Sequence, residues 1–353
     1  MKNKLYYKVF TLFIVFIAFK AISLESLVNL EDNAQDFVLE TKRIEIPGYP
    51  NAFNPSIVRW RGGVLLSFRT IPNPRLSFNS WIGLVWLDEN FSPNSQPQLI
   101  PIREVQSPIP SRVDDARLIV MDEHLYIVYS DNSDPTITRG GFRVHFAELD
   151  FDGSCFAIDY PECLHHFEGE NKDRREKNWV PFEYNSSLLL AYSLTPHLIL
   201  YPIYGTGSCK TVATTMGSIQ WEWGEPRGGT PGILVGNEYL AFFHSSKELA
   251  TTHSEGKNIL HYFMGAYTFS CEPPFAITKI SPEPIVGKNF YKGAIYKPYW
   301  KPVRVVFPCG FLCDDKYIWV AYGRQDHEVW IAKLDKKGLF DSLLPVANHM
   351  KNG

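Results

Sequence analysis

A fivefold repeat constrains the fold of this chain more than any other feature of its sequence. Five segments read as a tight turn followed by a strongly apolar strand that ends in an aromatic residue. These terminal aromatics are Phe68, Tyr129, Tyr192, Phe243 and Tyr322. Fourteen positions before each one a distinctive motif begins, and the first residues of these motifs are Asn54, Asp115, Asn178, Gly229 and Pro308. The shared offset predicts five β-hairpins of equal length.

The distances between the hairpins predict the remaining strands. Successive terminal aromatics are 61, 63, 51 and 79 residues apart, which leaves room for two further strands in each unit. Four strands repeated five times form an all-β, five-bladed β-propeller. Only one clear strand follows the fifth hairpin, so we expect residues 37–46 to close the last blade from the N-terminus. The alternative is an all-β sandwich in which the likeness between hairpins is accidental.

Composition agrees with a chain of short strands and turns. The sequence has 9 Trp, 18 Tyr, 25 Pro and 24 Gly, and aromatic residues favour strands whereas Pro and Gly interrupt them. Hydrophobic residues make up 45% of the chain, which excludes a disordered protein. The formal net charge of -3 argues against a nucleic-acid partner.

The first 25 residues read as a separate segment. Three lysines within residues 1–8 precede an apolar run over residues 9–19, which is short for a membrane span. We predict a signal peptide or, if uncleaved, an N-terminal membrane anchor, with the rest of the chain exported to a periplasmic, secreted or lumenal location. Residues 36–340 are then the propeller domain and residues 341–353 a C-terminal tail. Membrane contact is expected only through the N-terminal segment.

The densest charged motif begins the second hairpin. Arg112-Val-Asp114-Asp115-Ala-Arg117 places two carboxylates side by side at the start of a strand, so only one of them can face the channel. A carboxyl group beside apolar walls and a second carboxylate can keep its proton near neutral pH and act as a general acid. Asp115 is the candidate. The alternative is that Asp115 pairs with Arg117 or caps a turn.

Two further motifs are typical of sugar binding. Asn54 and Arg69, at the two ends of the first hairpin, can hydrogen-bond sugar hydroxyls or a carboxylate. Glu176-Lys177-Asn178-Trp179 combines charged groups with a large aromatic face on which a sugar could stack. The structural alternatives are a turn Asn, a surface Arg and a Trp in the blade core.

Other candidates lie on the later hairpins. Arg227-Gly-Gly-Thr230-Pro indicates a backbone that approaches a ligand closely, although glycines in a turn explain it equally well. Tyr322-Gly-Arg324-Gln-Asp326 offers a second carboxylate. His197 and His244 follow second strands, where core or surface histidines are more frequent. The six cysteines show no zinc-like spacing, so no metal is implied.

These motifs, in this order, resemble those of glycoside hydrolase family 130, the β-mannoside phosphorylases and hydrolases, which are five-bladed propellers. The likeness spans about residues 50 to 335. Asn54-Pro55 with Arg69 looks like the family's Asn-Pro and Arg, and Asp114-Asp115-Ala116-Arg117 looks like its Glu-Asp-Pro-Arg. The most specific likeness is to Phe-Pro-Cys-Gly followed by Tyr-Gly and Asp. Its counterparts here are Phe307-Pro-Cys-Gly310, Tyr322-Gly323 and Asp326, and Tyr262-Phe-Met-Gly265-Ala266 looks like the family's Tyr-x-x-Gly-Ala.

The resemblance implies roles for individual residues. Asp115 would be the general acid of an inverting mechanism, delivering its proton to the glycosidic oxygen through a sugar hydroxyl. Asn54, Arg69 and Asp326 would hold the sugar whose anomeric carbon reacts. The remaining predicted substrate contacts are Asp114, Arg117, Lys177, Asn178, Trp179, Thr230, Tyr262 and Tyr322. In the family's phosphorylases phosphate attacks the sugar, whereas in its hydrolases a carboxylate activates water.

The sequence also departs from the family pattern. The His-Arg-Pro that the phosphorylases carry after the third hairpin is replaced by Tyr192-Ser-Leu-Thr-Pro196-His197. A phosphate site is therefore assigned to Arg143, Lys177, His197 and His244. Phosphate is expected as an optional co-substrate, with no cofactor.

Related propellers of glycosyltransferase family 108 use GDP-mannose or mannose phosphate. Three hypotheses follow: cleavage of β-mannosides, mannosyl transfer to a glycan, and a propeller that binds an oligosaccharide without catalysis.

Overall fold

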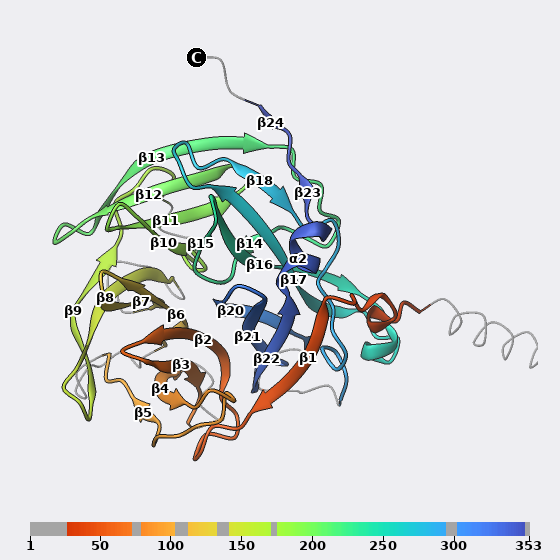
Figure 1. Cartoon of the computed structure of the whole chain (residues 1–353), viewed down its shortest axis with the longest axis horizontal. Helices are drawn as coiled ribbons and strands as arrows, with labels where there is room; N and C mark the ends of the chain where they lie inside the picture. The colour runs from red at the N-terminus through yellow and green to blue at the C-terminus, as the bar shows by residue number, and fades with distance from the viewer. Residues whose placement is uncertain are drawn as a thin grey trace, which may run out of the picture.

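The computed structural model describes residues 27–72, 79–102, 112–132, 141–170, 175–293 and 302–349 (Figure 1). The predicted signal peptide or anchor lies outside these residues. Within the described part of the chain, no helix has the length and apolar character needed to cross a membrane.

Largely antiparallel sheets arranged around a common axis form an all-β propeller, which confirms that part of the predicted fold class (Figure 1). The described strands make five sheets. The first contains β2 (Phe53–Trp60), β3 (Gly63–Thr70), β4 (Trp81–Leu87) and β5 (Gln98–Leu99). The second contains β6 (Asp114–Met121), β7 (His124–Asp131), β8 (Arg143–Phe151) and β9 (Phe156–Leu164).

The third and fourth sheets are larger. The third contains β10 (Val180–Tyr184), β11 (Ser187–Leu194), β12 (His197–Ile203), β13 (Ser208–Gly217) and β24 (Asn348–His349). The fourth is built on the long pair β16 (Glu238–Leu249) and β17 (Ile259–Ser270). Its shorter strands are β14 (Arg227–Gly228), β15 (Ile233–Val235), β18 (Ile277–Ile280), β19 (Val303–Arg304) and β23 (Leu344–Pro345).

The last sheet combines one strand from the N-terminal part of the chain with three from its C-terminal part. It contains β20 (Val306–Cys313), β21 (Tyr317–Arg324) and β22 (Glu328–Asp335), and β1 (Val38–Ile44) pairs antiparallel with β22. The described residues also form three short helices: η1 (Leu30–Asn33), η2 (Thr252–Ser254) and α2 (Lys336–Ser342).

The segment predicted as a C-terminal tail contributes to the sheets. β23 pairs with β18, and β24 pairs with β13. The prediction of a tail from residue 341 is therefore wrong for residues 344–349, because short strands without an apolar run give little sequence signal.

Hydrophobic side chains fill the space between neighbouring sheets. One cluster joins the first and second sheets around Leu65 and Ile127, and another joins the last sheet to the first around Leu66 and Ile331. Three further clusters link the remaining neighbours. Each sheet thus buries both faces, which explains why the second strand of each hairpin reads as a continuous apolar run.

The terminal aromatics of two hairpins pack on a glycine of the next strand. Phe68 lies opposite Gly83, and Phe243 lies opposite Gly265. A Cβ atom at Gly83 would lie 2.3 Å from Cζ of Phe68, and one at Gly265 would lie 2.3 Å from Cζ of Phe243. The aromatic rings therefore occupy the space that a side chain would need.

We predict that Gly83→Ala destabilises the fold by about 1–3 kcal/mol, because the added methyl group must displace the buried Phe68 ring. Chemical denaturation measures the loss. In a Phe68→Leu background the same change should cost clearly less, since the smaller side chain leaves room. Equal costs in the two backgrounds would contradict this explanation.

Candidate active site

A repeated strained backbone position directs polar side chains toward the propeller axis. Asn54, Asp115 and Asn178 begin three equivalent motifs, and their φ angles are 48°, 51° and 67°. The strand register shifts at the first two sites, between Phe53 and Ser56 and between Asp114 and Arg117. Such bulges bend the strand and redirect a side chain. Asn and Asp tolerate a left-handed conformation better than most residues, which accounts for their use here.

These side chains meet in a cavity of about 390 Å³ at one mouth of the channel. It collects eight of the predicted site residues: Asn54, Arg69, Asp115, Lys177, Asn178, His244, Tyr262 and Asp326. It also contains residues that the sequence reasoning did not assign to the site: Glu225, Arg227, Ser246, Val305 and Phe307.

Arg69 holds the two adjacent carboxylates of the second motif. Its Nη2 lies 2.5 Å from Oδ1 of Asp114, and its Nη1 lies 3.3 Å from Oδ1 of Asp115. Nδ2 of Asn54 donates to the same Asp115 oxygen at 2.8 Å. Lys177 Nζ lies 3.8 Å from Oδ2 of the buried Asp114. Asp115 therefore faces the cavity with partners from the first hairpin, while Asp114 supports the two cations beside it.

The environment separates the pKa values of the two carboxyl groups in the cavity. Burial acts to raise the pKa of Asp115, but the charges of Arg69, Lys177 and Arg117 and the hydrogen bond from Asn54 lower it to about 2. Burial raises the pKa of Asp326 to about 6, with Asp115 and Asp114 acting in the same direction against Arg69 and Lys177. Asp115 is thus ionised near neutral pH in the ligand-free site, contrary to the expectation that it keeps its proton there.

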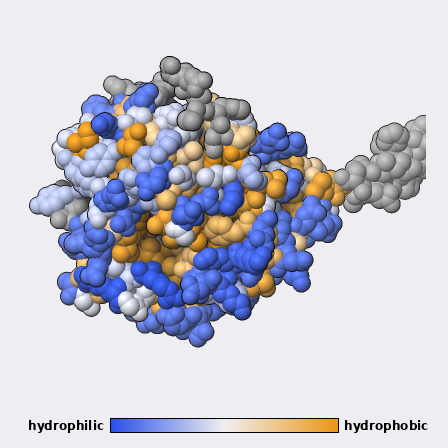
Figure 2. All heavy atoms as spheres, turned by 45° about the horizontal axis from the view of Figure 1, so that its top comes forward, coloured by the Kyte–Doolittle hydropathy of each residue, from blue (hydrophilic) through white to orange (hydrophobic). Residues whose placement is uncertain are grey.

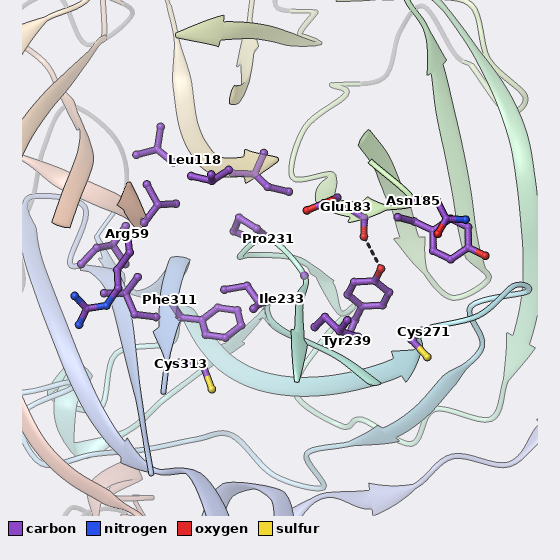
Figure 3. A pocket seen from close by; sticks show the side chains of 18 of the residues that line it. Arg59, Leu118, Glu183, Asn185, Pro231, Ile233, Tyr239, Cys271, Phe311 and Cys313 are labelled. Carbon is purple, nitrogen blue, oxygen red and sulfur yellow. Dashed lines mark hydrogen bonds between the residues drawn. The ribbon is translucent and has the colours of Figure 1, made fainter. Parts of the chain in front are cut away.

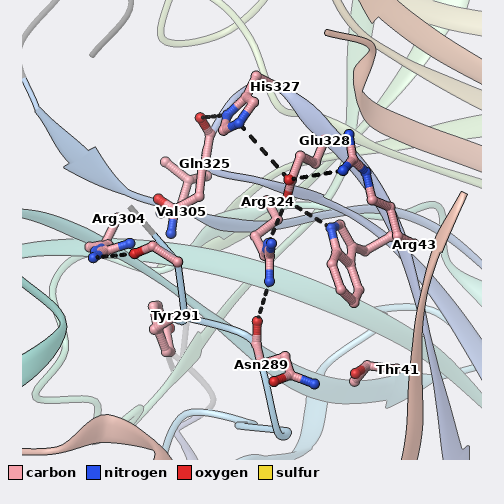
Figure 4. Close-up of polar contacts among 12 residues, drawn as sticks. Thr41, Arg43, Asn289, Tyr291, Arg304, Val305, Arg324, Gln325, His327 and Glu328 are labelled. Carbon is pink, nitrogen blue, oxygen red and sulfur yellow. Dashed lines mark hydrogen bonds and ion pairs between the residues drawn. The ribbon is translucent and has the colours of Figure 1, made fainter. Parts of the chain in front are cut away.

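Asp326 lies in the tight turn between β21 and β22. Gln325 and Asp326 both adopt left-handed conformations, with φ angles of 57° and 55°. Arg324 Nε donates to Glu328 Oε2 at 2.6 Å across the turn, and Arg324 Nη1 donates to the carbonyl oxygen of Asn289 at 2.7 Å (Figure 4). This polar cluster fixes the turn and so fixes the position of Asp326.

Arg117 lies beneath the cavity as a buried link between sheets. Its Nε donates to the carbonyl oxygen of Gly229 at 2.6 Å and its Nη1 to that of Asp115 at 2.6 Å. Its Nη2 donates to Oδ1 of Asn178 at 3.1 Å. The sequence predicts Arg117 as a substrate contact. Because Arg117 does not line the cavity, it instead positions Asp115 and Asn178.

His244 lines the cavity as a neutral side chain. Its Nδ1 lies 2.9 Å from the carbonyl oxygen of Gly228, and burial together with Arg117, Lys177 and Arg227 lowers its pKa to about 3. Since Nδ1 donates to that carbonyl, Nε2 remains as an acceptor. The residue predicted as part of a phosphate site is therefore no cation.

Five other predicted residues do not line the cavity. Trp179 is 1% exposed and packs against Phe167 and Tyr192, so it offers no platform for a sugar. Although it follows Asn178 directly, it lies in the apolar core between the second and third sheets. Tyr322 lies in the apolar core that joins the fourth and last sheets.

The remaining three residues are buried, and their polar atoms contact groups outside the cavity. Thr230 Oγ1 accepts a hydrogen bond from the backbone N–H of Phe242. His197 Nδ1 contacts the carbonyl oxygen of Phe275 at 2.8 Å, and Arg143 pairs with Glu170 at 3.2 Å. His197 and Arg143 thus drop out of the predicted phosphate site, which leaves Lys177 as its one assigned cation that lines the cavity.

Arg227 is the main functional group that the sequence analysis passed over. It lines the cavity and pairs with Glu225, whose Oε2 lies 3.1 Å from its Nη2. The signal was present, since Arg227 begins the Arg-Gly-Gly-Thr-Pro motif. Ser246 follows His244 by two positions on the same strand, so strand alternation places both on one face.

The whole propeller matches a known family. A sequence profile described as β-1,4-mannooligosaccharide phosphorylase matches residues 32–343. The chain belongs to glycoside hydrolase family 130. The members of this family are glycoside phosphorylases and hydrolases, so the chain belongs to a family of enzymes. No curated protein matches the sequence.

Solved structures share the fold at low sequence identity. A mannose phosphorylase from Leishmania mexicana in complex with phosphate has a TM-score of 0.59 and 12% identity, covering 90% of this chain and 94% of its own. A β-1,2-mannobiose phosphorylase from Listeria innocua has a TM-score of 0.55 and 14% identity, covering 88% and 95%. A GDP-mannose-dependent mannosyltransferase from Leishmania mexicana has a TM-score of 0.58 and 10% identity, covering 85% and 90%.

The raised pKa of Asp326 predicts that this carboxylate lowers the stability of the ligand-free protein. A group whose pKa is higher in the folded state than in the unfolded state destabilises the fold at pH values above both. Asp326→Asn should therefore raise the free energy of unfolding at pH 7.5 by on the order of 1–3 kcal/mol. The gain should shrink below pH 6 and vanish below about pH 4.

Thermal unfolding at several pH values measures this effect. Asp36→Asn, which removes an exposed carboxylate outside the cavity, is the matched control and should show no such pH dependence. A lower melting temperature for Asp326→Asn at pH 7.5 would contradict the argument.

Proposed function

We propose that this protein is a β-mannoside phosphorylase that uses inorganic phosphate as its second substrate. One observation carries the proposal: a single cavity joins Asn54, Arg69, Asp115 and Asp326 to the cations Lys177 and Arg227. The first four can bind a sugar and protonate its leaving group, and the cations can hold an anion. The phosphate-bound mannose phosphorylase among its structural neighbours supports phosphate as co-substrate.

In the proposed reaction Asp115 is the general acid. Asn54, Arg69 and Asp326 hold the mannosyl unit, and phosphate lies against Lys177 and Arg227. The bond from the anomeric carbon to the glycosidic oxygen breaks, and that oxygen gains a proton from Asp115 by way of a sugar hydroxyl. A phosphate oxygen bonds to the anomeric carbon from the opposite face, which inverts its configuration. The products are mannose 1-phosphate and the shortened saccharide.

Phosphate also provides a way to protonate Asp115. In the ligand-free site the nearby cations hold the pKa of Asp115 at about 2. A bound phosphate would neutralise Lys177 and add negative charge near the carboxylate, and both effects raise a carboxyl pKa. The general acid would then be protonated when its second substrate is present.

We also propose that each of the five sheets is one blade and that β1 closes the last blade. Five clusters of apolar side chains, one between each pair of neighbouring sheets, support this assignment. A ring of blades presents equivalent strand starts to one channel mouth. The sequence-based expectation of export through the N-terminal segment stays part of the proposal.

Product analysis tests the reaction. With β-1,2- and β-1,4-linked mannobiose, we expect mannose 1-phosphate to form only when phosphate is added. Asp115→Asn should lower kcat by on the order of 10²–10⁴-fold, the usual contribution of a general acid. Asp36→Asn is the matched control. Free mannose released equally with and without phosphate would indicate a hydrolase, and mannosyl transfer only from GDP-mannose would indicate a transferase.

A second prediction concerns the phosphate site. Arg227→Gln should raise the KM for phosphate about tenfold or more, because it removes a charge-assisted contact. Arg61→Gln is the control, since Arg61 lies over the Trp60 ring outside the cavity. A rise in the KM for mannoside with an unchanged KM for phosphate would place the anion elsewhere.

A further inference from the structure

A second cavity lies on the propeller axis, at the opposite end from the candidate active site. Its volume is about 610 Å³, and it shares no lining residue with the first cavity. Ile57 and Leu118 follow Asn54 and Asp115 by three positions on their strands, which corresponds to about 10 Å along the axis. We call it the basal cavity.

The buried core of the axis separates the two cavities. Arg117 crosses it with hydrogen bonds to Asp115, Asn178 and Gly229, and Ser56 Oγ accepts from the backbone N–H of Leu118 at 3.0 Å. A ligand in the basal cavity would therefore not contact the groups assigned to catalysis.

Inner strands of all five sheets form the basal cavity, and most of its walls are apolar. Ile57, Leu118, Ile233 and Phe311 come from four of these strands. The last three are labelled in Figure 3. On the face drawn in Figure 2, a hollow with apolar, orange walls lies within a hydrophilic, blue surface. The volume lies within the range typical of small-molecule sites, which are mostly apolar with few polar groups.

Among the charged groups that line the basal cavity, two are carboxylates and one is a cation. Glu183 and Glu272 both line it. Glu272 accepts a hydrogen bond from the hydroxyl of Tyr184 at 3.1 Å. Arg59 is the cation in the wall, and it lies 3.4 Å from a carboxylate outside the cavity, that of Glu89.

Glu183 has no ion-pair partner within the described part of the chain, and burial together with Asp122 raises the pKa of its carboxyl group. The backbone carbonyl of Glu183 accepts from the hydroxyl of Tyr239 (Figure 3). A half-buried carboxylate without a partner has lost part of its hydration, and a cation with its own apolar surface could both pair with it and fill the apolar cavity.

We propose that the basal cavity binds a small organic cation, with an ammonium or guanidinium group against Glu183 and an alkyl or aryl body between Ile57, Leu118 and Phe311. Charge complementarity selects this ligand class over neutral and anionic ones, because the carboxylates outnumber the cations of the wall. The proposal is independent of the reaction assigned to the other cavity.

Calorimetric titration with three probes of equal length tests it: n-octylammonium, 1-octanol and octanoate. Octylammonium should bind about tenfold more tightly than 1-octanol, and octanoate should bind more weakly than both. Glu183→Gln should bring the affinity for octylammonium down to that for 1-octanol. Glu183→Asp, which retains the charge, should keep the preference. Glu40→Gln, at an exposed position of strand β1, is the matched control and should change nothing.

Three outcomes would overturn the proposal. Equal affinities of the wild-type protein for octylammonium and 1-octanol would remove the role of charge, and a preference that survives Glu183→Gln would place the cation elsewhere. Loss of octylammonium binding in Asp326→Asn, with binding kept in Glu183→Gln, would place it in the active-site cavity. Circular dichroism of each variant shows that the fold is intact.

Discussion

The site depends on the buried guanidinium of Arg117, which forms hydrogen bonds to residues of three sheet-forming motifs. A charged group in the interior is stable only when its donors are satisfied, and Arg117 donates to groups of three different motifs. These hydrogen bonds fix the backbone of Asp115, the amide of Asn178 and the backbone of Gly229 relative to one another. The same side chain closes the axis, so the polar cavity above it and the apolar cavity below it are separate.

The arrangement of charges above Arg117 is costly for folding and useful for chemistry. Arg69 faces two carboxylates at once, and burial, together with these two carboxylates, raises the pKa of Asp326 to about 6. Left-handed backbone at Asn54, Asp115, Asn178 and Asp326 adds local strain of order 1 kcal/mol each. The surrounding apolar clusters between sheets stabilise this arrangement. Strain and unfavourable charge of this kind are typical of functional sites.

Sequence reasoning predicted the members of the site better than their individual roles. The equal offsets of five motifs indicated that Asn54, Asp115 and Asn178 would converge, and the cavity contains all three. Trp179 was predicted as a substrate contact and His244 as part of a phosphate site, and the structure gives a physical reason against each role. Trp179 is buried against Phe167 and Tyr192, and His244 is neutral because burial and neighbouring cations lower its pKa. Neither effect is visible in a residue's type.

By itself, the sequence determined the repeat, the class of fold and the family to which the chain belongs. Apolar periodicity and turn residues are local properties, so they can be read along the chain. The tertiary structure alone decided how far the pKa values of Asp115 and Asp326 differ, which residues support the site from beneath and where the largely apolar basal cavity lies. These properties depend on burial and on distances between charges from different sheets, such as Arg69 and Asp115. Such distances exist only once the sheets have closed around the axis.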